Sequence, residues 1–141
     1  MRISIDSCVF IRGIRSQTSD AYQLLRQVGP NLNLVIPRLI AQEVTRNLTQ
    51  TEQIKTFYRQ FAQQRYAFIV EEPVPRTLVH KYIQLGLPAK ADAFIGGFCE
   101  WLEIDCLISD NRHFLRELKT TAYLVQTPSD FLAVYGEENL L

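Results

Sequence analysis

The chain has 141 residues with an apolar fraction of 47%, and its 15 basic and 15 acidic side chains cancel to a formal charge of zero. This length and apolar content predict one globular domain over residues 1–141 and exclude an intrinsically disordered protein. The balanced charge excludes a polycation that binds nucleic acid nonspecifically. The longest uncharged stretch, from Gln27 to Pro37, has 11 residues, whereas a membrane-spanning helix needs about 20.

The start of the chain and its cysteines indicate an intracellular protein. Asp6 interrupts the apolar start, and no long apolar run with a cleavage site follows, so no secretory leader is expected. Three cysteines, Cys8, Cys99 and Cys106, show neither C-x-x-C spacing nor histidines at zinc-ligand spacing. We therefore expect three buried, reduced core cysteines and a cytoplasmic location.

The zero net charge is the sum of two halves of the chain that carry opposite net charges. Residues 1–70 hold nine basic and four acidic side chains, a net of +5, and residues 71–141 hold six and eleven, a net of −5. A neutral chain of this kind can still present a basic surface beside an acidic pocket.

The first half of the chain alternates between strand and helix patterns. A strand at 3–5 ends at Asp6, and a polar break is expected over 13–19. A helix capped by Ser19 or Asp20 follows and ends at Gly29 and Pro30. A buried strand is predicted at 32–36, and two amphipathic helices at 39–48 and 54–61.

The second half continues this alternation. Strands are predicted at 67–70, 106–108 and 122–125, and helices at 78–85, 89–102, 114–118 and 128–135. Parallel strands need crossover connections, and right-handed crossovers place helices over the sheet. The pattern therefore predicts an α/β fold with a central parallel sheet of about five strands and helices on both faces.

Four carboxylates fall where the carboxyl edge of such a sheet is expected, which is where ligands bind in open parallel sheets. Asp6 follows the first strand, and Glu43 lies in the second turn of the helix after the second strand. Asp92 lies in the first turn of its helix, and Asp110 ends a strand with Asn111 beside it. Each acid alone is also explained by helix capping or by a solvated helix face.

Together, four acids at one edge repel one another and favour a bound cation. A ligand set of oxygen atoms suits Mg²⁺ or Mn²⁺ better than Zn²⁺. Such an ion lowers the pKa of a bound water and contacts a phosphate oxygen, which is the chemistry that phosphodiester hydrolysis needs.

Four segments resemble, in order and in context, the PIN domain, the nuclease fold of VapC-type toxins. They are ISIDSCVFI at 3–11, IP and QEV at 36–44, ADAFI at 91–95 and LISDNRHF at 107–114. The resemblance implies a single PIN-like nuclease domain that hydrolyses single-stranded RNA with Mg²⁺ or Mn²⁺. It also implies a toxin of a type II toxin–antitoxin pair, a small antitoxin partner whose helix enters an apolar groove, and a homodimer.

The resemblance also implies roles for individual residues. Asp6, Glu43 and Asp92 match the acids that bind the metal directly or through water, and Ser7 and Ser109 match hydroxyl residues that position metal or water.

Two positions depart from the PIN pattern. Cys8 stands where the family often has asparagine, and Asn111 stands where it usually has the fourth acid. Either Asp110 turns inward as that acid, or Asn111 replaces it with a neutral amide oxygen. We expect Asp110 to be the charged contributor, with Asn111 also near the metal.

The remaining candidates are basic residues. An RNA-binding surface is predicted from Arg38, Arg46, Lys55, Arg59, Arg65 and Arg112, although such charges also occur on the solvated faces of amphipathic helices. His113 is expected to have a surface or capping role. The alternative function is a PIN-like module that binds single-stranded or structured RNA, or a protein, with weak or no cleavage; Cys8 and Asn111 motivate it.

Overall fold

The computed structural model describes residues 1–62, 65–88 and 90–140. The strands are β1 (Arg2–Ile5), β2 (Asn33–Pro37), β3 (Ala67–Val70), β4 (Cys106–Ile108) and β5 (Leu124–Gln126). The α-helices are α1 (Ser7–Arg15), α2 (Asp20–Arg26), α3 (Arg38–Asn47), α4 (Thr51–Arg59), α5 (Arg76–Gln84), α6 (Lys90–Trp101) and α7 (Pro128–Leu140). A short π-helix, η1, spans His113–Glu117.

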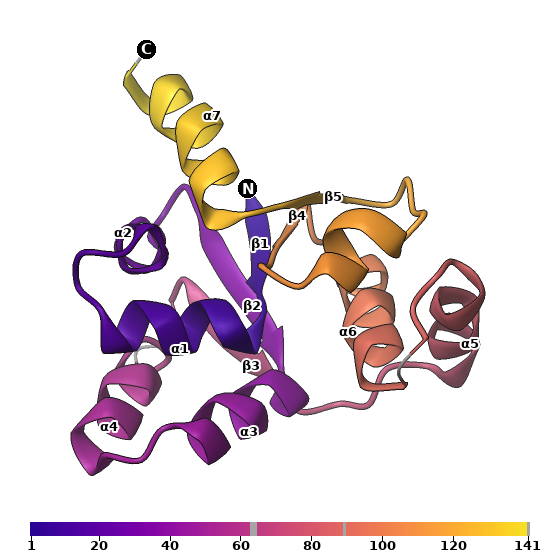
Figure 1. The fold of residues 1–141 in the computed structure, drawn as a ribbon, viewed down its shortest axis with the longest axis horizontal. Helices are drawn as coiled ribbons and strands as arrows, with labels where there is room; N and C mark the ends of the chain where they lie inside the picture. The colour runs from indigo at the N-terminus through magenta and orange to yellow at the C-terminus, as the bar shows by residue number, and fades with distance from the viewer. Residues whose placement is uncertain (63–64, 89, 141) are drawn as a thin grey trace.

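The strands form one parallel sheet in the order β3-β2-β1-β4-β5 within the described residues. Helices α1 to α4 lie on one side of this sheet, and α5, α6 and η1 lie on the other (Figure 1). The predicted α/β fold with a five-stranded parallel sheet covered on both faces is thus confirmed. Because β1 is the central strand, whatever follows it lies in the middle of the carboxyl edge.

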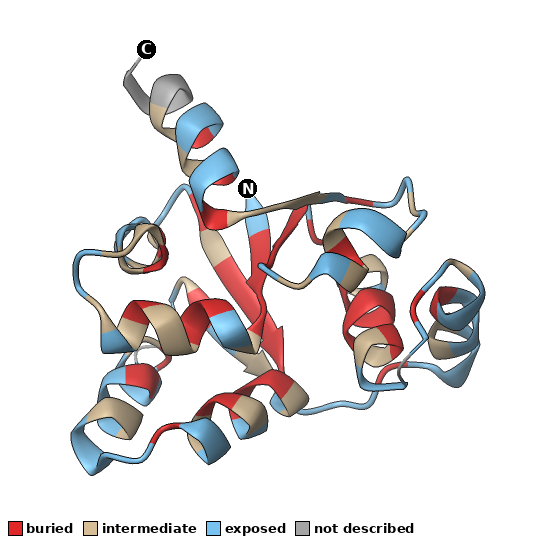
Figure 2. Ribbon diagram, viewed as in Figure 1, coloured by how far each residue is buried: buried red, intermediate tan, exposed pale blue. Residues whose placement is uncertain are grey.

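The core lies along β1, β2 and β4, whose side chains are buried on both faces of the sheet (Figure 2). Ile3, Ile5, Leu34, Ile36 and Leu107 are all fully buried. Short, continuous apolar strands of this kind are typical of parallel sheets that helices cover on both sides. Within the described part of the chain, no helix combines the length and apolar character needed to cross a membrane.

The polar break predicted over 13–19 is wrong in its first part, because α1 continues to Arg15. Gly13 is buried where α1 meets α2, and a Cβ atom there would lie 2.9 Å from Leu25 Cδ1 and 3.1 Å from the Ala21 carbonyl carbon. The glycine therefore serves close helix packing. Its role depends on α2, which a local sequence pattern does not place.

Other element boundaries also differ from the predicted ones. β5 begins at Leu124 because that residue is in register with Cys106 of β4, and α7 extends well beyond residue 135. The helix predicted at 114–118 is the π-helix η1. Ala89, the first residue of the helix predicted at 89–102, lies outside the described residues.

Two of the three cysteines match their predicted environment. Cys99 and Cys106 are buried free thiols, whereas the prediction for Cys8 is wrong, since this residue is exposed. Cys8 is the second residue of α1, at the carboxyl edge of the sheet, and its Sγ lies 3.8 Å from Asp6 Oδ2.

Replacing Gly86 with alanine is expected to destabilise the protein by about 2–4 kcal/mol. Gly86 has a φ of 115°, and a Cβ atom there would lie 2.2 Å from the Glu117 carbonyl oxygen. Gly29→Ala is the matched control, because a Cβ atom there would lie 3.9 Å from the Gln27 carbonyl oxygen, an ordinary van der Waals contact. Urea denaturation of both variants measures the difference, and equal midpoints would contradict the expectation.

Candidate active site

Asp6 lies where β1 ends and α1 begins. Its Oδ1 accepts a hydrogen bond of 2.8 Å from the Ser7 backbone N–H and so caps α1. Its Oδ2 accepts a hydrogen bond of 2.8 Å from Ser109 Oγ. The register of β1 with β4 pairs Ile5 with Ile108, which places the next residues of the two strands side by side. Asp6 is only 5% exposed.

Glu43 joins the site from the other side of β1. It lies on α3, which follows β2, the strand next to β1. Ser7 Oγ donates a hydrogen bond of 2.9 Å to Glu43 Oε2. Ser7 therefore connects two carboxylates, since its amide binds Asp6 and its hydroxyl binds Glu43.

Asp92 and Asn111 complete the cluster. Asp92 is in the first turn of α6, and Asn111 lies near enough to lower the pKa of this carboxyl. The Asn111 N–H donates to Ser109 Oγ over 2.9 Å, and Asn111 Oδ1 accepts from the His113 N–H over 3.0 Å. Hydrogen bonds thus link Asp6 through Ser109 to Asn111, and Asn111 lies near Asp92.

The ionised form of Asp6 is destabilised in the folded protein. Burial raises its pKa above the usual 3.8, and the charges of Glu43 and Asp92 raise it further, while the bonds from Ser109 and Ser7 lower it. Burial also raises the pKa of Asp92, against the effects of His113 and Asn111. Among the described residues, no basic side chain forms an ion pair with Asp6, Glu43 or Asp92. A cation at this site would relieve the repulsion.

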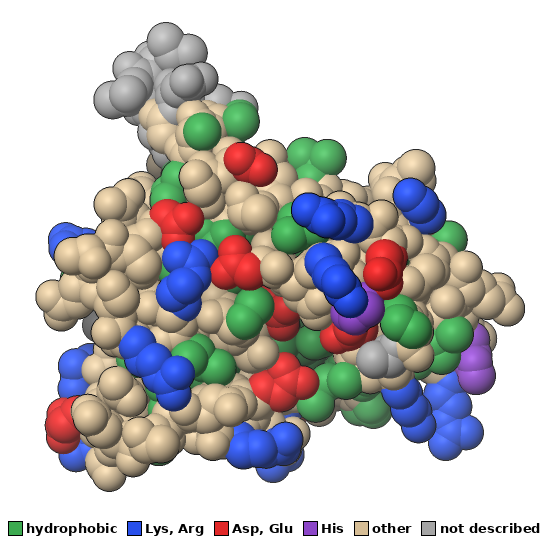
Figure 3. Space-filling model, in the orientation of Figure 1, with side chains coloured by type: hydrophobic (Ala, Val, Ile, Leu, Met, Phe, Trp, Pro, Cys, Tyr) green, Lys and Arg blue, Asp and Glu red, His purple; other side chains and the backbone are tan. Residues whose placement is uncertain are grey.

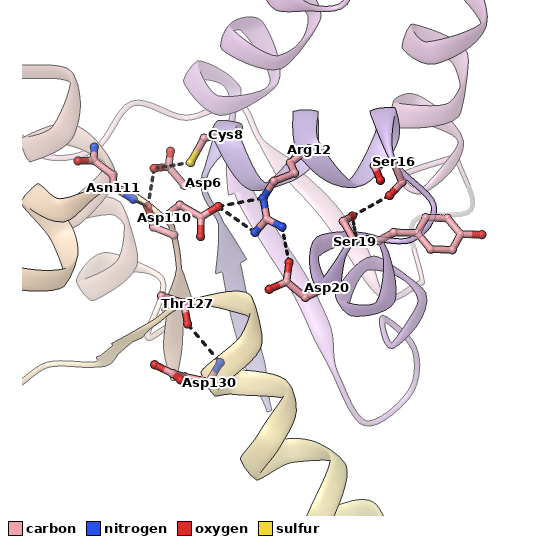
Figure 4. Close-up of polar contacts among 12 residues, drawn as sticks. Asp6, Cys8, Arg12, Ser16, Ser19, Asp20, Asp110, Asn111, Thr127 and Asp130 are labelled. Carbon is pink, nitrogen blue, oxygen red and sulfur yellow. Dashed lines mark hydrogen bonds and ion pairs between the residues drawn. The ribbon is translucent and has the colours of Figure 1, made fainter.

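Asp110 lies at the rim of the cluster, with its side chain 39% exposed. Its Oδ2 accepts from Arg12 Nη2 over 2.9 Å and from Arg12 Nε over 3.2 Å, and Arg12 also pairs with Asp20 (Figure 4). The inward-turned Asp110 that the sequence favoured is therefore not the arrangement seen. Asn111, one residue later, is the residue that lies near enough to Asp92 to lower its pKa.

The donor set fits a hard divalent cation in its chemistry. Asp6, Glu43 and Asp92 offer carboxylate oxygens, which Mg²⁺ and Mn²⁺ prefer, and the buried Asp6 is destabilised by like charge. As the side chains stand, no three His, Cys, Asp or Glu side chains in the described part of the chain come close enough to share an ion. Binding would therefore require the carboxylate side chains to move closer together.

Comparison with known proteins identifies the fold. No family model matches the sequence, and no curated protein sequence matches it. Among solved structures, VapBC2 from Rickettsia felis bound to a promoter DNA fragment has a TM-score of 0.65 at 11% identity, covering 90% of this chain and 98% of that chain. VapBC-1 from nontypeable Haemophilus influenzae has a TM-score of 0.63 at 17% identity, covering 92% and 99%. FitAcB from Neisseria gonorrhoeae has a TM-score of 0.59 at 16% identity, covering 90% and 98%.

The chain therefore has the PIN fold. The PIN fold brings together six of the residues that the sequence singled out, from segments that are distant along the chain: Asp6, Ser7, Glu43, Asp92, Ser109 and Asn111. At these identities the likeness concerns the fold, and the chemistry of the site depends on the residues themselves.

The sequence did not point to Arg12, which anchors Asp110 from α1. These two residues are 98 positions apart, and no local pattern connects them. Of the surface or capping role expected for His113, capping is not seen: Asn111 Oδ1 accepts from the His113 N–H, and His113 Nδ1 lies 2.5 Å from Glu117 Oε2. His113 also lies near enough to Asp92 to lower the pKa of that carboxyl, an effect that spacing alone did not indicate.

The predicted basic surface is divided in the PIN fold. Arg38 begins α3 and pairs with Glu71 over 3.4 Å, and Arg112 directly follows Asn111, so both flank the acids. Lys55 and Arg59 lie on α4, which packs against α1. Arg46 is in the last turn of α3, and Arg65 stacks on Tyr66 beyond α4. Acidic side chains gather toward the middle of the viewed face, with basic side chains to either side (Figure 3).

Proposed function

We propose that this protein is a divalent-metal-dependent endoribonuclease that hydrolyses phosphodiester bonds of single-stranded RNA. The observation that supports it most is the linked set of carboxylates Asp6, Glu43 and Asp92 at the carboxyl edge of a PIN fold. The buried Asp6 feels the negative charge of both other acids, which favours a cation between them.

Asp6, Glu43 and Asp92 would hold Mg²⁺ or Mn²⁺. When bound, such an ion supplies a water of lowered pKa and polarises the phosphate. Ser109 and the Ser7 N–H fix the orientation of Asp6, and the Ser7 hydroxyl fixes Glu43. These contacts hold the carboxylates in place before substrate arrives.

Residues around the acids would orient the RNA. Asn111 lies near Asp92 and accepts a hydrogen bond from the first N–H of η1, which fixes the loop that also contains Arg112. Arg38 and Arg112 would contact phosphates on either side of the cleaved bond. Arg12 holds the charge of Asp110 at the rim.

Asn111→Ala is expected to lower cleavage about 10- to 100-fold, because it removes the amide that lies near Asp92 and caps η1. Asp110→Asn is expected to change the rate less than about 10-fold, because the Asp110 carboxylate binds Arg12 at the exposed rim. The two variants are compared by measuring their single-turnover rates of cleavage of the same RNA. A larger loss for Asp110→Asn would assign the fourth acidic position to Asp110.

A metal titration tests the function itself. Wild type and Asp92→Asn are incubated with tRNA, rRNA and mRNA under increasing Mn²⁺ or Mg²⁺, with EDTA as the metal-free control. Metal-dependent cleavage by the wild type and its loss in the variant support the proposal. Metal binding without cleavage of any RNA would favour the RNA- or protein-binding module instead.

We further propose that the chain is the toxin of a toxin–antitoxin pair, acts as a homodimer and works in the cytoplasm. The support is the fold shared with chains of the VapBC complexes, which are toxin–antitoxin assemblies. Expression of the chain alone should arrest growth, and co-expression of a small protein encoded next to it should restore growth. Light scattering measures the oligomeric state.

A further inference from the structure

A cavity of about 450 Å³ opens beside the acid cluster, between the first turns of α3 and α6. Its lining includes Gln42, the residue before Glu43, and Ala91, the residue before Asp92. On both α3 and α6, a residue that lines the cavity therefore directly precedes an acid of the cluster. The cavity and the carboxylates occupy the same edge of the sheet, where β2 and β3 end at Pro37 and Val70.

The walls of this cavity are apolar, and its rim is charged. Phe94 from α6 and Leu39 from α3 line it together with Pro73 from the loop after β3. Phe94 and Leu39 are partly buried and pack against the core, which holds their side chains in place. An aromatic ring in a fixed apolar wall is the kind of surface on which an unpaired nucleobase stacks.

The rim of the cavity carries groups that can bind the phosphate of a nucleotide and groups that can bind its base. Arg38 and Lys90 line it as cations, and the ion pair of Arg38 with Glu71 is exposed, with 65% of each side chain accessible, so a phosphate can compete for the arginine. Gln42 and Glu72 line it as hydrogen-bonding groups. Glutamine pairs with adenine, and a carboxylate accepts from an exocyclic amine of a base.

We infer that this cavity binds one unpaired nucleobase of the RNA substrate, next to the cleaved phosphate, and prefers bases with an exocyclic amino group over uracil. The inference rests on the proposed ribonuclease function. The base stacks on Phe94, and its amino group donates to Glu72 or to the Gln42 amide oxygen. Arg38 and Lys90 contact the flanking phosphates. Uracil has no exocyclic amine, and the only donor on its base-pairing edge is N3–H, so it satisfies fewer of these acceptors.

The test measures binding separately from cleavage. Fluorescein-labelled pentanucleotides UUAUU, UUCUU, UUGUU and UUUUU are titrated by anisotropy with full-length Asp6→Asn protein in EDTA. The expected result is at least about 5-fold tighter binding of an amino-bearing base than of the all-uridine control. Adding Phe94→Ala or Gln42→Ala should remove this preference, and Phe94→Tyr should retain it.

Tyr58→Ala is the matched control, because Tyr58 is an exposed aromatic residue on α4 that does not line the cavity. Thermal melts identify any variant that fails to fold; Gln42 is exposed, so Gln42→Ala tests the idea independently of the core. Equal binding of all four RNAs, or a preference that persists in both Phe94→Ala and Gln42→Ala, would overturn the inference. A change of dimerisation in Phe94→Ala without any base preference would instead assign the cavity to contacts between copies.

The same RNAs are then incubated with wild-type protein and Mn²⁺. Cleavage without base preference contradicts the base-binding cavity and leaves the ribonuclease proposal intact. Base preference in binding without cleavage contradicts the ribonuclease proposal and leaves an RNA-binding cavity.

Discussion

Asp6→Asn is expected to lower RNA cleavage at least about 100-fold while the protein keeps its fold. Asp6 is the most buried of the three acids and the one to which both serines are hydrogen-bonded. An asparagine of the same shape can still cap α1 through its amide oxygen. The change therefore removes the charge that a metal ion needs, with little effect on packing.

The measurement is initial-rate cleavage of a labelled single-stranded RNA, with circular dichroism to verify the fold. Asp130→Asn serves as the control, because Asp130 is an exposed acid in the first turn of α7, outside the cluster. It should cleave at the wild-type rate. Wild-type activity in highly purified Asp6→Asn protein would show that the reaction does not depend on this carboxylate.

Added Mn²⁺ is expected to stabilise the wild type by about 2.7 kcal/mol at one hundred times its dissociation constant. The stabilisation arises because the ion binds the folded carboxylates and not the unfolded chain. Asp6→Asn should lose most of it, whereas Asp130→Asn should keep it. Urea denaturation with and without Mn²⁺ measures the effect; equal stabilisation of wild type and Asp6→Asn would place the ion elsewhere.

Without metal, ionisation of Asp6 and Asp92 should destabilise the folded protein as the pH rises. The pKa values of Asp6 and Asp92 are raised above 3.8 in the folded protein, so the folded state binds more protons than the unfolded state. Their contribution to stability is complete below about pH 3.8 and is lost as the pH rises through the folded pKa values. Asp6→Asn should therefore become more stable than the wild type as the pH rises from 4 to 7 in EDTA. A constant difference across this range would contradict the raised pKa of Asp6.

The sequence predicted the sheet and the acids well, because both depend on local patterns. Apolar strands such as 106–108 and amphipathic helices such as α3 are recognisable from spacing. Asp6 was identified because it directly follows the first strand. Since β1 is the central strand, the residue that follows it lies at the middle of the carboxyl edge of the sheet.

Other features depended on contacts between distant segments. Gly13 looked like the start of a loop, yet it is where α1 packs on α2. The choice between Asp110 and Asn111 depended on Arg12, which binds Asp110 from α1 and leaves Asn111 beside Asp92. The backbone after β4 sets the direction in which each of these two neighbouring side chains points, and no periodicity in the sequence specifies that backbone.

By itself, the sequence determined the alternation of strands and helices, the all-oxygen character of the site and the segments that contribute to it. It could do so because backbone propensity and side-chain chemistry are properties of short stretches. Only the tertiary structure decided which carboxylate is buried, which is held by an arginine, and that an apolar cavity lies beside them. Burial, ion pairing and cavities depend on the packing of segments up to about one hundred residues apart, and that packing exists only in the folded chain.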